Sequence, residues 1–326
     1  MGREQQTLEI LSDGGFHSSE ALAAQTTSNR AAVRNIIHSL QMQGIAIEFV
    51  KGRGYRLEPA VELLSKDEIC KELSAVAQSR LTNIEIYLHI DSTNSYLMRV
   101  AKSGLPSGAV CLAELQLAGR GRSNRPWVSP FASNLYLSLL WRFEIGAAQL
   151  SGISLAAGIA VVQALERLGV TDVGLKWPND LLWQKRKLGG VLLEFGGNTN
   201  NACYVVTGIG LNVAMPAAAQ IHIDQPWTDL NNILGSERIP RNRLAARVLE
   251  QIVTAYVDIE HKGLGSLTDL WRRYDLVANR KVILRLPSTT VIGIARGIDT
   301  TGALLLETEE GIQRFMAGEI SLRFNQ

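Results

Sequence analysis

Residues 173–213 read VGLKWPNDLLWQKRKLGGVLLEFGGNTNNACYVVTGIGLNV, and this stretch determines the fold of the central part of the chain. Apolar runs at residues 173–177, 191–195 and 204–213 are typical of strands, and no helix-like spacing separates them. Parallel neighbours need long crossover connections, usually helices, so the sheet is expected to be mixed or largely antiparallel. A doubly wound nucleotide-binding fold is therefore disfavoured.

The common phosphate-binding loops are also missing. No G-x-x-x-x-G-K-[ST] segment occurs, and residues 208–212, GIGLN, lack the third glycine of a dinucleotide loop. Any ATP site in this chain must therefore be of another kind. Further strand-like runs at residues 84–90, 109–115 and 135–141, with helices at 94–102 and 150–168, complete a long α/β region.

Three basic segments lie within or near the quoted stretch: GRGRSNR at residues 119–125, KWPND at 176–180 and RKLGG at 186–190. The glycines permit backbone angles that other residues avoid, and each guanidinium offers a planar fork of donors. Flexible backbone and fixed positive charge are what the capture of a carboxylate and a triphosphate requires. The alternative interpretation of the first segment alone is a solvated basic loop.

Length and charge limit the function classes. A chain of 326 residues predicts two or three domains, and a formal net charge of +2 with a pI near 8.4 means that any DNA binding must come from a local patch. Cys70, Cys111 and Cys203 are widely separated, which argues against a disulfide framework or a thiolate metal site. With no apolar signal segment or membrane span in the sequence, we expect a cytoplasmic protein.

The first sixty residues have the order helix, helix, helix, hairpin, which indicates a winged helix-turn-helix. Ser18 or Ser19 is expected to cap the second helix and Ser28 the third, and residues 45–49 and 55–57 form the hairpin. The third helix would enter a major groove. Its candidate DNA-binding residues are Asn29, Arg30, Arg34, Asn35 and His38. A small protein-interaction module is the alternative.

The end of the chain has short β segments at residues 281–286, 291–296, 303–307, 313–316 and 320–324, with tight turns between them. This pattern predicts a five-stranded small barrel. The expected domains are 1–64 for DNA binding, 65–270 for catalysis and 271–326 for the barrel.

The chain resembles the bifunctional biotin protein ligase and biotin operon repressor family over essentially its full length. The matching motifs are Phe16-His17-Ser18, Arg30-Ala31-Ala32, Gly52-Arg53-Gly54-Tyr55, Asp91-Ser92-Thr93-Asn94, Gly119-Arg120-Gly121-Arg122, Lys176-Trp177-Pro178-Asn179-Asp180, Arg186-Lys187-Leu188, Gly210-Leu211-Asn212, Arg296-Gly297-Ile298-Asp299 and Gly302-Ala303-Leu304-Leu305-Leu306-Glu307. The resemblance implies an α+β multidomain fold: a winged helix-turn-helix, a class II synthetase-like α/β domain with a mixed sheet, and an SH3-like small β-barrel.

The resemblance also implies a two-step reaction. Biotin and ATP, with Mg²⁺, form biotinoyl-5'-AMP, and a lysine of the biotin carboxyl carrier protein of acetyl-CoA carboxylase then attacks it. The adenylate-bound homodimer would bind the operator DNA of a biotin operon as a repressor. A lipoate or octanoate ligase, or a ligand-sensing transcription factor without catalysis, is the alternative.

The implied site residues fall into three groups. The implied biotin contacts are Ser92, Thr93, Asn94, Gln116, Arg120, Arg122 and Lys187. The implied nucleotide contacts are Arg122, Lys176, Asn179, Asn212 and Trp227. The implied catalytic residues are Arg122, Lys187 and Asp180, and Asp180 is either a Mg²⁺ ligand or a carboxylate near the incoming lysine.

The arginine loop departs from the family pattern. Ser123-Asn124 replaces an Arg-Gly pair, Pro126 replaces a lysine, and Leu117 replaces a second glutamine. Because asparagine tolerates left-handed backbone angles, the loop shape is expected to survive. Our hypothesis is that ligation is retained while the binding of the intermediate is tuned differently.

Overall fold

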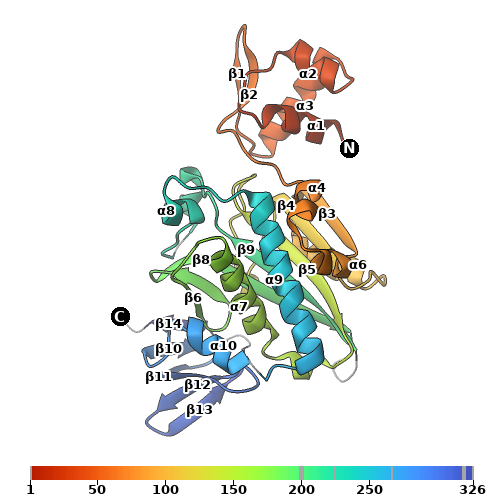
Figure 1. The fold of residues 1–326 in the computed structure, drawn as a ribbon. Helices are drawn as coiled ribbons and strands as arrows, with labels where there is room; N and C mark the ends of the chain where they lie inside the picture. Colours follow the sequence, from red (N-terminus) through yellow and green to blue (C-terminus); the bar gives the residue numbers. More distant parts are fainter. Residues whose placement is uncertain (1, 198–201, 224, 266, 318–320, 325–326) are drawn as a thin grey trace.

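The computed structural model describes residues 2–197, 202–223, 225–265, 267–317 and 321–324. Figure 1 shows a small helical unit at one end, a central sheet covered by helices, and a small β unit at the other end. A single extended connection, residues 58–65, joins the helical unit to the central one.

The helical unit contains α1 (Arg3–Leu11), α2 (Ser19–Gln25), α3 (Arg30–Met42) and the hairpin of β1 (Ile47–Val50) and β2 (Gly54–Leu57). The predicted order is confirmed. Ser18 caps α2, but the predicted cap of α3 at Ser28 is wrong: Asn29 is the cap, and its Oδ1 accepts from Ala32 N at 2.8 Å. An amide one residue closer to the helix start reaches the exposed N–H groups of the first turn.

The central sheet has seven strands in the order β3-β4-β5-β9-β8-β7-β6. Their bounds are β3 Asn83–Ile90, β4 Ala109–Gln116, β5 Leu135–Phe143, β6 Val173–Lys176, β7 Asp180–Trp183, β8 Arg186–Gly197 and β9 Cys203–Leu211. Only β3 and β4 pair in parallel among these strands, so the predicted mixed, largely antiparallel sheet is confirmed. The sequence prediction missed β7, which forms a hairpin with β6.

Alternation along the strands divides the sheet between two hydrophobic layers. In β4, Val110 and Leu112 belong to the large core, while Cys111 and Ala113 belong to a smaller one. The smaller core lies under α6 (Thr93–Ala101). The larger one lies under α4 (Lys66–Glu72), α5 (Ala75–Arg80), α7 (Ile153–Arg167) and α9 (Arg241–Lys262).

The C-terminal unit comprises α10 (Leu267–Tyr274) and an antiparallel sheet in the order β13-β12-β11-β10-β14. Its strands are β10 Lys281–Arg285, β11 Thr290–Ile298, β12 Leu304–Thr308, β13 Gly311–Phe315 and β14 Ser321–Phe324. The five predicted strands are present, although residue 320 of the last one lies outside the described residues. Closure into an SH3-like barrel stays a prediction. Val282, Leu284 and Leu304 join the large core of the central unit.

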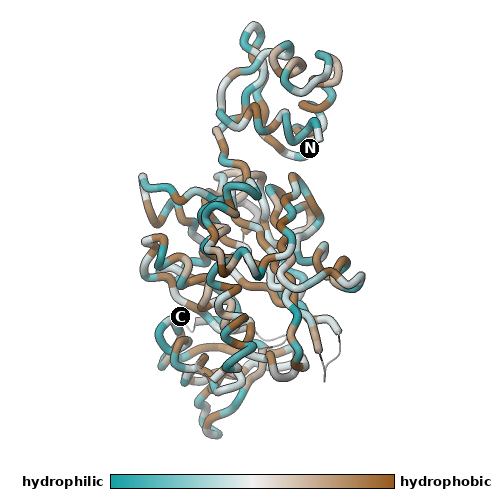
Figure 2. Tube along the Cα trace, turned by 45° about the vertical axis from the view of Figure 1, so that its right-hand side comes forward, coloured by the Kyte–Doolittle hydropathy of each residue, from teal (hydrophilic) through white to brown (hydrophobic). Residues whose placement is uncertain are grey.

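Short elements complete the described chain: η1 Arg122–Asn124, η2 Ala147–Leu150, η3 Ala217–His222 and α8 Leu230–Leu234. In Figure 2 hydrophobic segments run through each of the three units, and hydrophilic colour is prominent in outer loops. None of the described helices combines the length and apolarity that crossing a membrane requires.

The segment that connects the first two units is anchored to the central unit by a buried polar cluster. Arg241, at the start of α9, donates to Glu114 Oε2 at 2.7 Å, to the Glu62 carbonyl at 2.7 Å and to the Asn134 carbonyl at 3.1 Å. Leu64 N donates to the other oxygen of Glu114. The side chains of Arg241 and Glu114 are only 5% and 2% exposed, so each charge depends on the other for compensation.

We expect Arg241→Met to lower the free energy of unfolding by about 3–5 kcal/mol, because it leaves the buried Glu114 carboxylate without its cation. Urea denaturation followed by circular dichroism measures the loss. Arg272→Met is the control, since its ion pair with Asp269 is 78% exposed on both sides and contributes little. Equal losses in the two variants would contradict this account of the cluster.

Candidate active site

One pocket collects residues from all the predicted basic segments. Its walls come from the start of α6, the end of β4, the loop after β4, the β6–β7 turn, β8 and β9, with Leu322 and Arg323 from β14. Among the described residues lining the pocket, the cationic ones are Arg120, Arg122, Arg125, Lys176, Lys187 and Arg323. Asp180 is the one carboxylate among these lining residues, so the pocket strongly favours an anionic ligand.

Polar residues at the start of α6 form another part of the pocket lining. Ser92 caps the helix by accepting from Ser95 N at 3.4 Å, and Thr93 N donates to Gln116 Oε1 at 3.0 Å. Ser92, Thr93 and Asn94 are buried. These three side chains and that of Gln116, all predicted biotin contacts, line the pocket. Ser92 therefore both caps the helix and lies in the pocket lining.

The arginine loop folds back on itself across residues 119–127. Gly121 N donates to the Arg125 carbonyl and Trp127 N to the Gly119 carbonyl, each at 2.8 Å. A Cβ at Gly119 would lie 2.7 Å from the Trp127 carbonyl oxygen, so the turn requires glycine there. Ser123 and Asn124 adopt φ of 52° and 53°, the left-handed region expected for the loop to keep its shape.

Asp180 lies between two ammonium groups. Its Oδ2 is 2.7 Å from Lys176 Nζ, and its Oδ1 is 2.7 Å from Lys187 Nζ. Burial alone would raise the pKa of Asp180, but the two lysines outweigh it and lower the pKa to about 2. Burial lowers the pKa of Lys176, and Asp180 opposes that change. The carboxylate therefore allows two like charges to be held in one pocket wall.

Arg122 and Asn179 connect the arginine loop to the β6–β7 turn. Arg122 Nη1 donates to Asn179 Oδ1 at 3.3 Å, and Asn179 Nδ2 donates to the Val191 carbonyl at 3.0 Å. Burial lowers the pKa of Arg122, with Asp180 opposing it, but a guanidinium stays protonated at any ordinary pH. Arg122 thus brings a permanent positive charge to the pocket wall.

Asn212 and Trp227 lie beside the pocket and are not part of its wall. Asn212 Nδ2 donates to the Thr228 carbonyl at 3.0 Å, and the 226–228 segment pairs with the backbone of Lys187 on both sides. The two predicted nucleotide residues are therefore placed where they fix the segment that carries Lys187.

The predicted DNA-binding residues, away from this pocket, are exposed along and just before α3: Asn29, Arg30, Arg34, Asn35 and His38. Asn29 is occupied as the helix cap, and Arg30 forms an ion pair with Glu20 at 2.6 Å. The exposed surface of α3 therefore carries Arg34, Asn35 and His38 toward solvent.

Comparison with known proteins gives the family. The Biotin/lipoate A/B protein ligase family profile matches residues 87–212, the Biotin protein ligase C terminal domain profile matches 277–323, and an HTH domain profile matches 3–56. The bifunctional ligase/repressor BirA of Salmonella typhimurium is 41% identical over 97% of this chain and 96% of its own length. The chain belongs to the BirA family of biotin protein ligases.

Other members of the BirA family support the same assignment. BirA of Escherichia coli is 40% identical over 97% of this chain and 96% of its own length. The solved structure of biotin protein ligase from Aquifex aeolicus in complex with biotin and ATP is 29% identical, with a TM-score of 0.63. It covers 75% of this chain and 100% of that protein.

Several residues in or next to the pocket of this BirA family member were missed from the sequence. Trp127 lies against Gly210 and places its ring 5.5 Å from Lys187 Nζ, and Arg323 reaches the pocket from the C-terminal unit. Glu194 bonds both Arg120 and Asn94. Trp127 could have been found from its place in the arginine loop, whereas nothing local marks Arg323 or Glu194.

Magnesium is the ion that the family assignment implies. Mg²⁺ takes oxygen ligands in a nearly ideal octahedron, and both oxygens of Asp180 are bonded to lysines. The described residues contain no group of three His, Cys, Asp or Glu side chains arranged to hold a metal. These described residues therefore do not fit a metal held by protein side chains.

The low pKa of Asp180 predicts an acid-dependent loss of stability. Its folded-state pKa of about 2 lies below the usual 3.8, so the stabilisation is complete above that usual value and is lost as the pH falls toward 2. We expect the gap in free energy of unfolding between wild type and Asp180→Asn to be constant at neutral pH and to shrink by pH 3. Urea denaturation across the pH range measures it, with exposed Asp269→Asn as control. A gap unchanged down to pH 3 would contradict the assignment.

Proposed function

We propose that this chain is an ATP-dependent ligase that activates biotin as biotinoyl-5'-AMP and transfers it to a lysine of a biotin carboxyl carrier protein. We further propose that the adenylate-bound homodimer represses a biotin biosynthesis operon. The observation that carries the ligase assignment is the convergence of Arg122, Lys176 and Lys187 on one pocket that is also lined by the polar start of α6. Biotin combines an anionic tail with a polar ring, which matches these two parts of the lining.

The first step needs charge neutralisation rather than a base. The carboxylate of biotin is already ionised at neutral pH. One of its oxygens attacks the α-phosphorus of ATP, the bond between the α-phosphorus and the bridging oxygen breaks, and pyrophosphate leaves. Two anions must approach each other, so Arg122 and Lys187 are assigned to stabilise the shared oxygens. Lys187 donates one ammonium hydrogen to Asp180, and its two other ammonium hydrogens remain for the ligand.

The second step transfers the acyl group. The neutral amine of the acceptor lysine attacks the carbonyl carbon of the mixed anhydride, the bond from that carbon to the phosphate oxygen breaks, AMP leaves, and the amine nitrogen gives up one proton to solvent as the amide forms. Asp180 is a poor acceptor for the amine proton, because two lysines lower its pKa to about 2. We therefore assign Asp180 to hold Lys176 and Lys187 in place. Asn179, Asn212 and Trp227 are proposed on the nucleotide side of the pocket.

Two features support the repressor half of the proposal. Arg34, Asn35 and His38 are exposed on α3, the second helix of the helix-turn-helix, which is the element that enters a major groove in this motif. In the sheet, β7 pairs with β8 only as far as Gly190, so residues 191–197 pair with β9 alone among the described strands. An unpaired strand edge is a surface at which a second copy can extend the sheet.

The alternative ligand is lipoate or octanoate, since the description of the matching family covers lipoate ligases as well as biotin ligases. Biotin is favoured because the chain also matches the biotin protein ligase C-terminal profile and an HTH profile. The second alternative is a sensor without catalysis. The retention of Arg122, Asp180 and Lys187 in hydrogen-bonding or ion-pair geometry favours catalysis over that alternative.

We expect biotin-dependent release of pyrophosphate from Mg-ATP, and none with lipoate at the same concentration. Lys187→Ala should slow the reaction by about 10²–10³-fold, because it removes a cation aimed at developing charge. The matched control is Lys185→Ala, an exposed lysine in the same turn. Release with neither acid would reject the ligase assignment and favour the sensor, and release with lipoate alone would favour the lipoate ligase.

We expect Arg34→Ala to weaken binding to DNA from the control region of biotin biosynthesis genes at least about tenfold, because an exposed guanidinium on α3 is lost. Fluorescence anisotropy with biotin and ATP present measures binding. Pyrophosphate release should be unchanged, since α3 lies in the first unit, apart from the central strands whose residues line the pocket (Figure 1). Loss of both DNA binding and pyrophosphate release would contradict the assignment of these two activities to separate units. Arg272→Ala is the matched control.

A further inference from the structure

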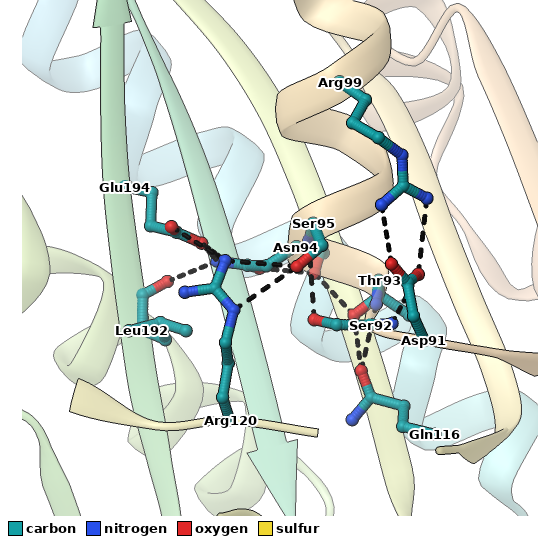
Figure 3. A network of polar contacts seen from close by, with 11 residues as sticks. Asp91, Ser92, Thr93, Asn94, Ser95, Arg99, Gln116, Arg120, Leu192 and Glu194 are labelled. Carbon is teal, nitrogen blue, oxygen red and sulfur yellow. Dashed lines mark hydrogen bonds and ion pairs between the residues drawn. The ribbon is translucent and has the colours of Figure 1, made fainter. Parts of the chain in front are cut away.

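Glu194, on β8, holds two residues of the pocket at once. Its Oε1 and Oε2 accept from Arg120 Nη2 at 2.9 and 2.8 Å, and Oε2 also accepts from Asn94 Nδ2 at 3.0 Å (Figure 3). Arg120 additionally donates to Ser95 Oγ from Nε and Nη2. Glu194 therefore joins the arginine loop to the start of α6 (Figure 3).

The carboxylate fixes which way the Asn94 amide faces. Asn94 is 3% exposed, and its Nδ2 donates to Glu194 and to the Leu192 carbonyl at 3.3 Å. Both partners can only accept, so exchanging the amide nitrogen and oxygen would place lone pairs against lone pairs. A Cβ at Gly208 would lie 2.2 Å from Asn94 Oδ1, which shows how closely the amide is pressed against β9. Asn94 Oδ1 must therefore face away from Glu194.

This orientation determines the hydrogen-bond direction in the next residues. Ser138 Oγ lies 2.6 Å from Asn94 Oδ1 and 2.7 Å from Thr93 Oγ1. Ser138 has one hydroxyl hydrogen, and Asn94 Oδ1 has none, so that hydrogen goes to Asn94. The Thr93 hydroxyl hydrogen then goes to Ser138 Oγ at 2.7 Å or to Gln116 Oε1 at 3.2 Å, and Thr93 Oγ1 keeps lone pairs in either case. Lone pairs of Asn94 Oδ1 and Thr93 Oγ1 are consequently left to accept from a ligand, and both residues line the pocket.

Arg120 makes this arrangement possible. Glu194 is 23% exposed and Arg120 28% exposed, so a carboxylate without its guanidinium would be poorly solvated beside the buried Asn94. The contacts of Arg120 with Ser95 and Glu194 use its Nε and Nη2, and Nη1 takes no part in them. The ion pair therefore neutralises Glu194 without removing every donor of Arg120 from the pocket.

We propose that Glu194 is a positioning residue for ligand specificity, an inference that rests on the proposed biotin ligase function. By fixing the hydrogen-bond direction of Asn94 and Ser138 beside Thr93, it makes this part of the pocket lining an acceptor surface for a ligand head that carries N–H groups. The cyclic urea of biotin has two N–H groups, whereas the dithiolane of lipoate has none. The same residue thus favours the urea and disfavours the lipoate alternative.

The test is Glu194→Gln in the full chain, assayed by pyrophosphate release. Glutamine keeps the size, but its amide can donate to Asn94 and cannot neutralise Arg120. We expect the KM for biotin to rise about tenfold or more, with the KM for ATP and kcat changed less than about threefold. Methylation of a ureido nitrogen of biotin should raise the KM in wild type, because it removes an N–H donor. The rise should be smaller in the variant, because the acceptor direction is no longer enforced there.

The matched control is Glu85→Gln, a carboxylate of the same sheet that bonds Asn83, Tyr87 and Tyr96 outside the pocket wall. Sedimentation of each variant checks that its oligomeric state equals that of wild type. If Glu194→Gln does not fold, Glu194→Asp replaces it, since the shortened carboxylate loses reach to Asn94 and should raise the KM for biotin in the same way.

The outcomes separate the two proposals. An active wild type with an unchanged KM for biotin in Glu194→Gln, or in Glu194→Asp where that variant is used, overturns the role of Glu194 and leaves the ligase assignment standing. Equal increases in the KM for biotin and for ATP also overturn it, because they indicate a general disturbance of the pocket. A wild type that releases no pyrophosphate with biotin rejects the ligase assignment, and the role of Glu194 fails with it.

Discussion

The pocket depends on one carboxylate, Asp180, that holds the buried ammonium group of Lys176 and the partly buried one of Lys187 near each other. Lys176 and Lys187 approach Asp180 at 2.7 Å from opposite oxygens. Without Asp180 their mutual repulsion at low dielectric would oppose the ionisation of both. The β6–β7 hairpin places Lys176 and Asp180 opposite each other as a register pair, and β8 brings Lys187 alongside. The positive character of the site is therefore a consequence of how the short strands β6 and β7 pair with each other and with the longer β8.

The pocket lining offers hydrogen-bond donors in one part and acceptors in another. The wall built from Arg122, Lys176 and Lys187 supplies hydrogen-bond donors and positive charge, while the floor at Thr93 and Asn94 supplies acceptors. A ligand with an anionic tail and an N–H-bearing head satisfies both, and a simple fatty acid satisfies only the wall. Each side has its own internal carboxylate, Asp180 for the wall and Glu194 for the floor, so the two sides can be altered independently.

Much of this arrangement could be predicted from the sequence, and the failures have physical causes. The long apolar strands and the α7 helix follow directly from periodicity, and every predicted biotin residue lies in the pocket wall. β7 was missed because it is only four residues long and its existence depends on pairing with β6 and β8. Glu194 was missed because its partners Arg120 and Asn94 are 74 and 100 residues away in the chain. The cap at Asn29 was misplaced by one residue, since Ser28 and Asn29 are both good capping residues.

Few of the described contacts connect the DNA-binding unit to the region of the pocket. The first unit has a hydrophobic core of its own, against which Leu88 of β3 and Phe131 of the loop before β5 pack from the central unit. The connection at residues 62–64 bonds to Glu114 and Arg241. Glu114 lies two residues before Gln116 on β4, and Asn134, which accepts from Arg241, holds Val213 N next to Asn212. The anchor of the first unit at Glu114 and the pocket residue Gln116 therefore share the same short stretch of β4.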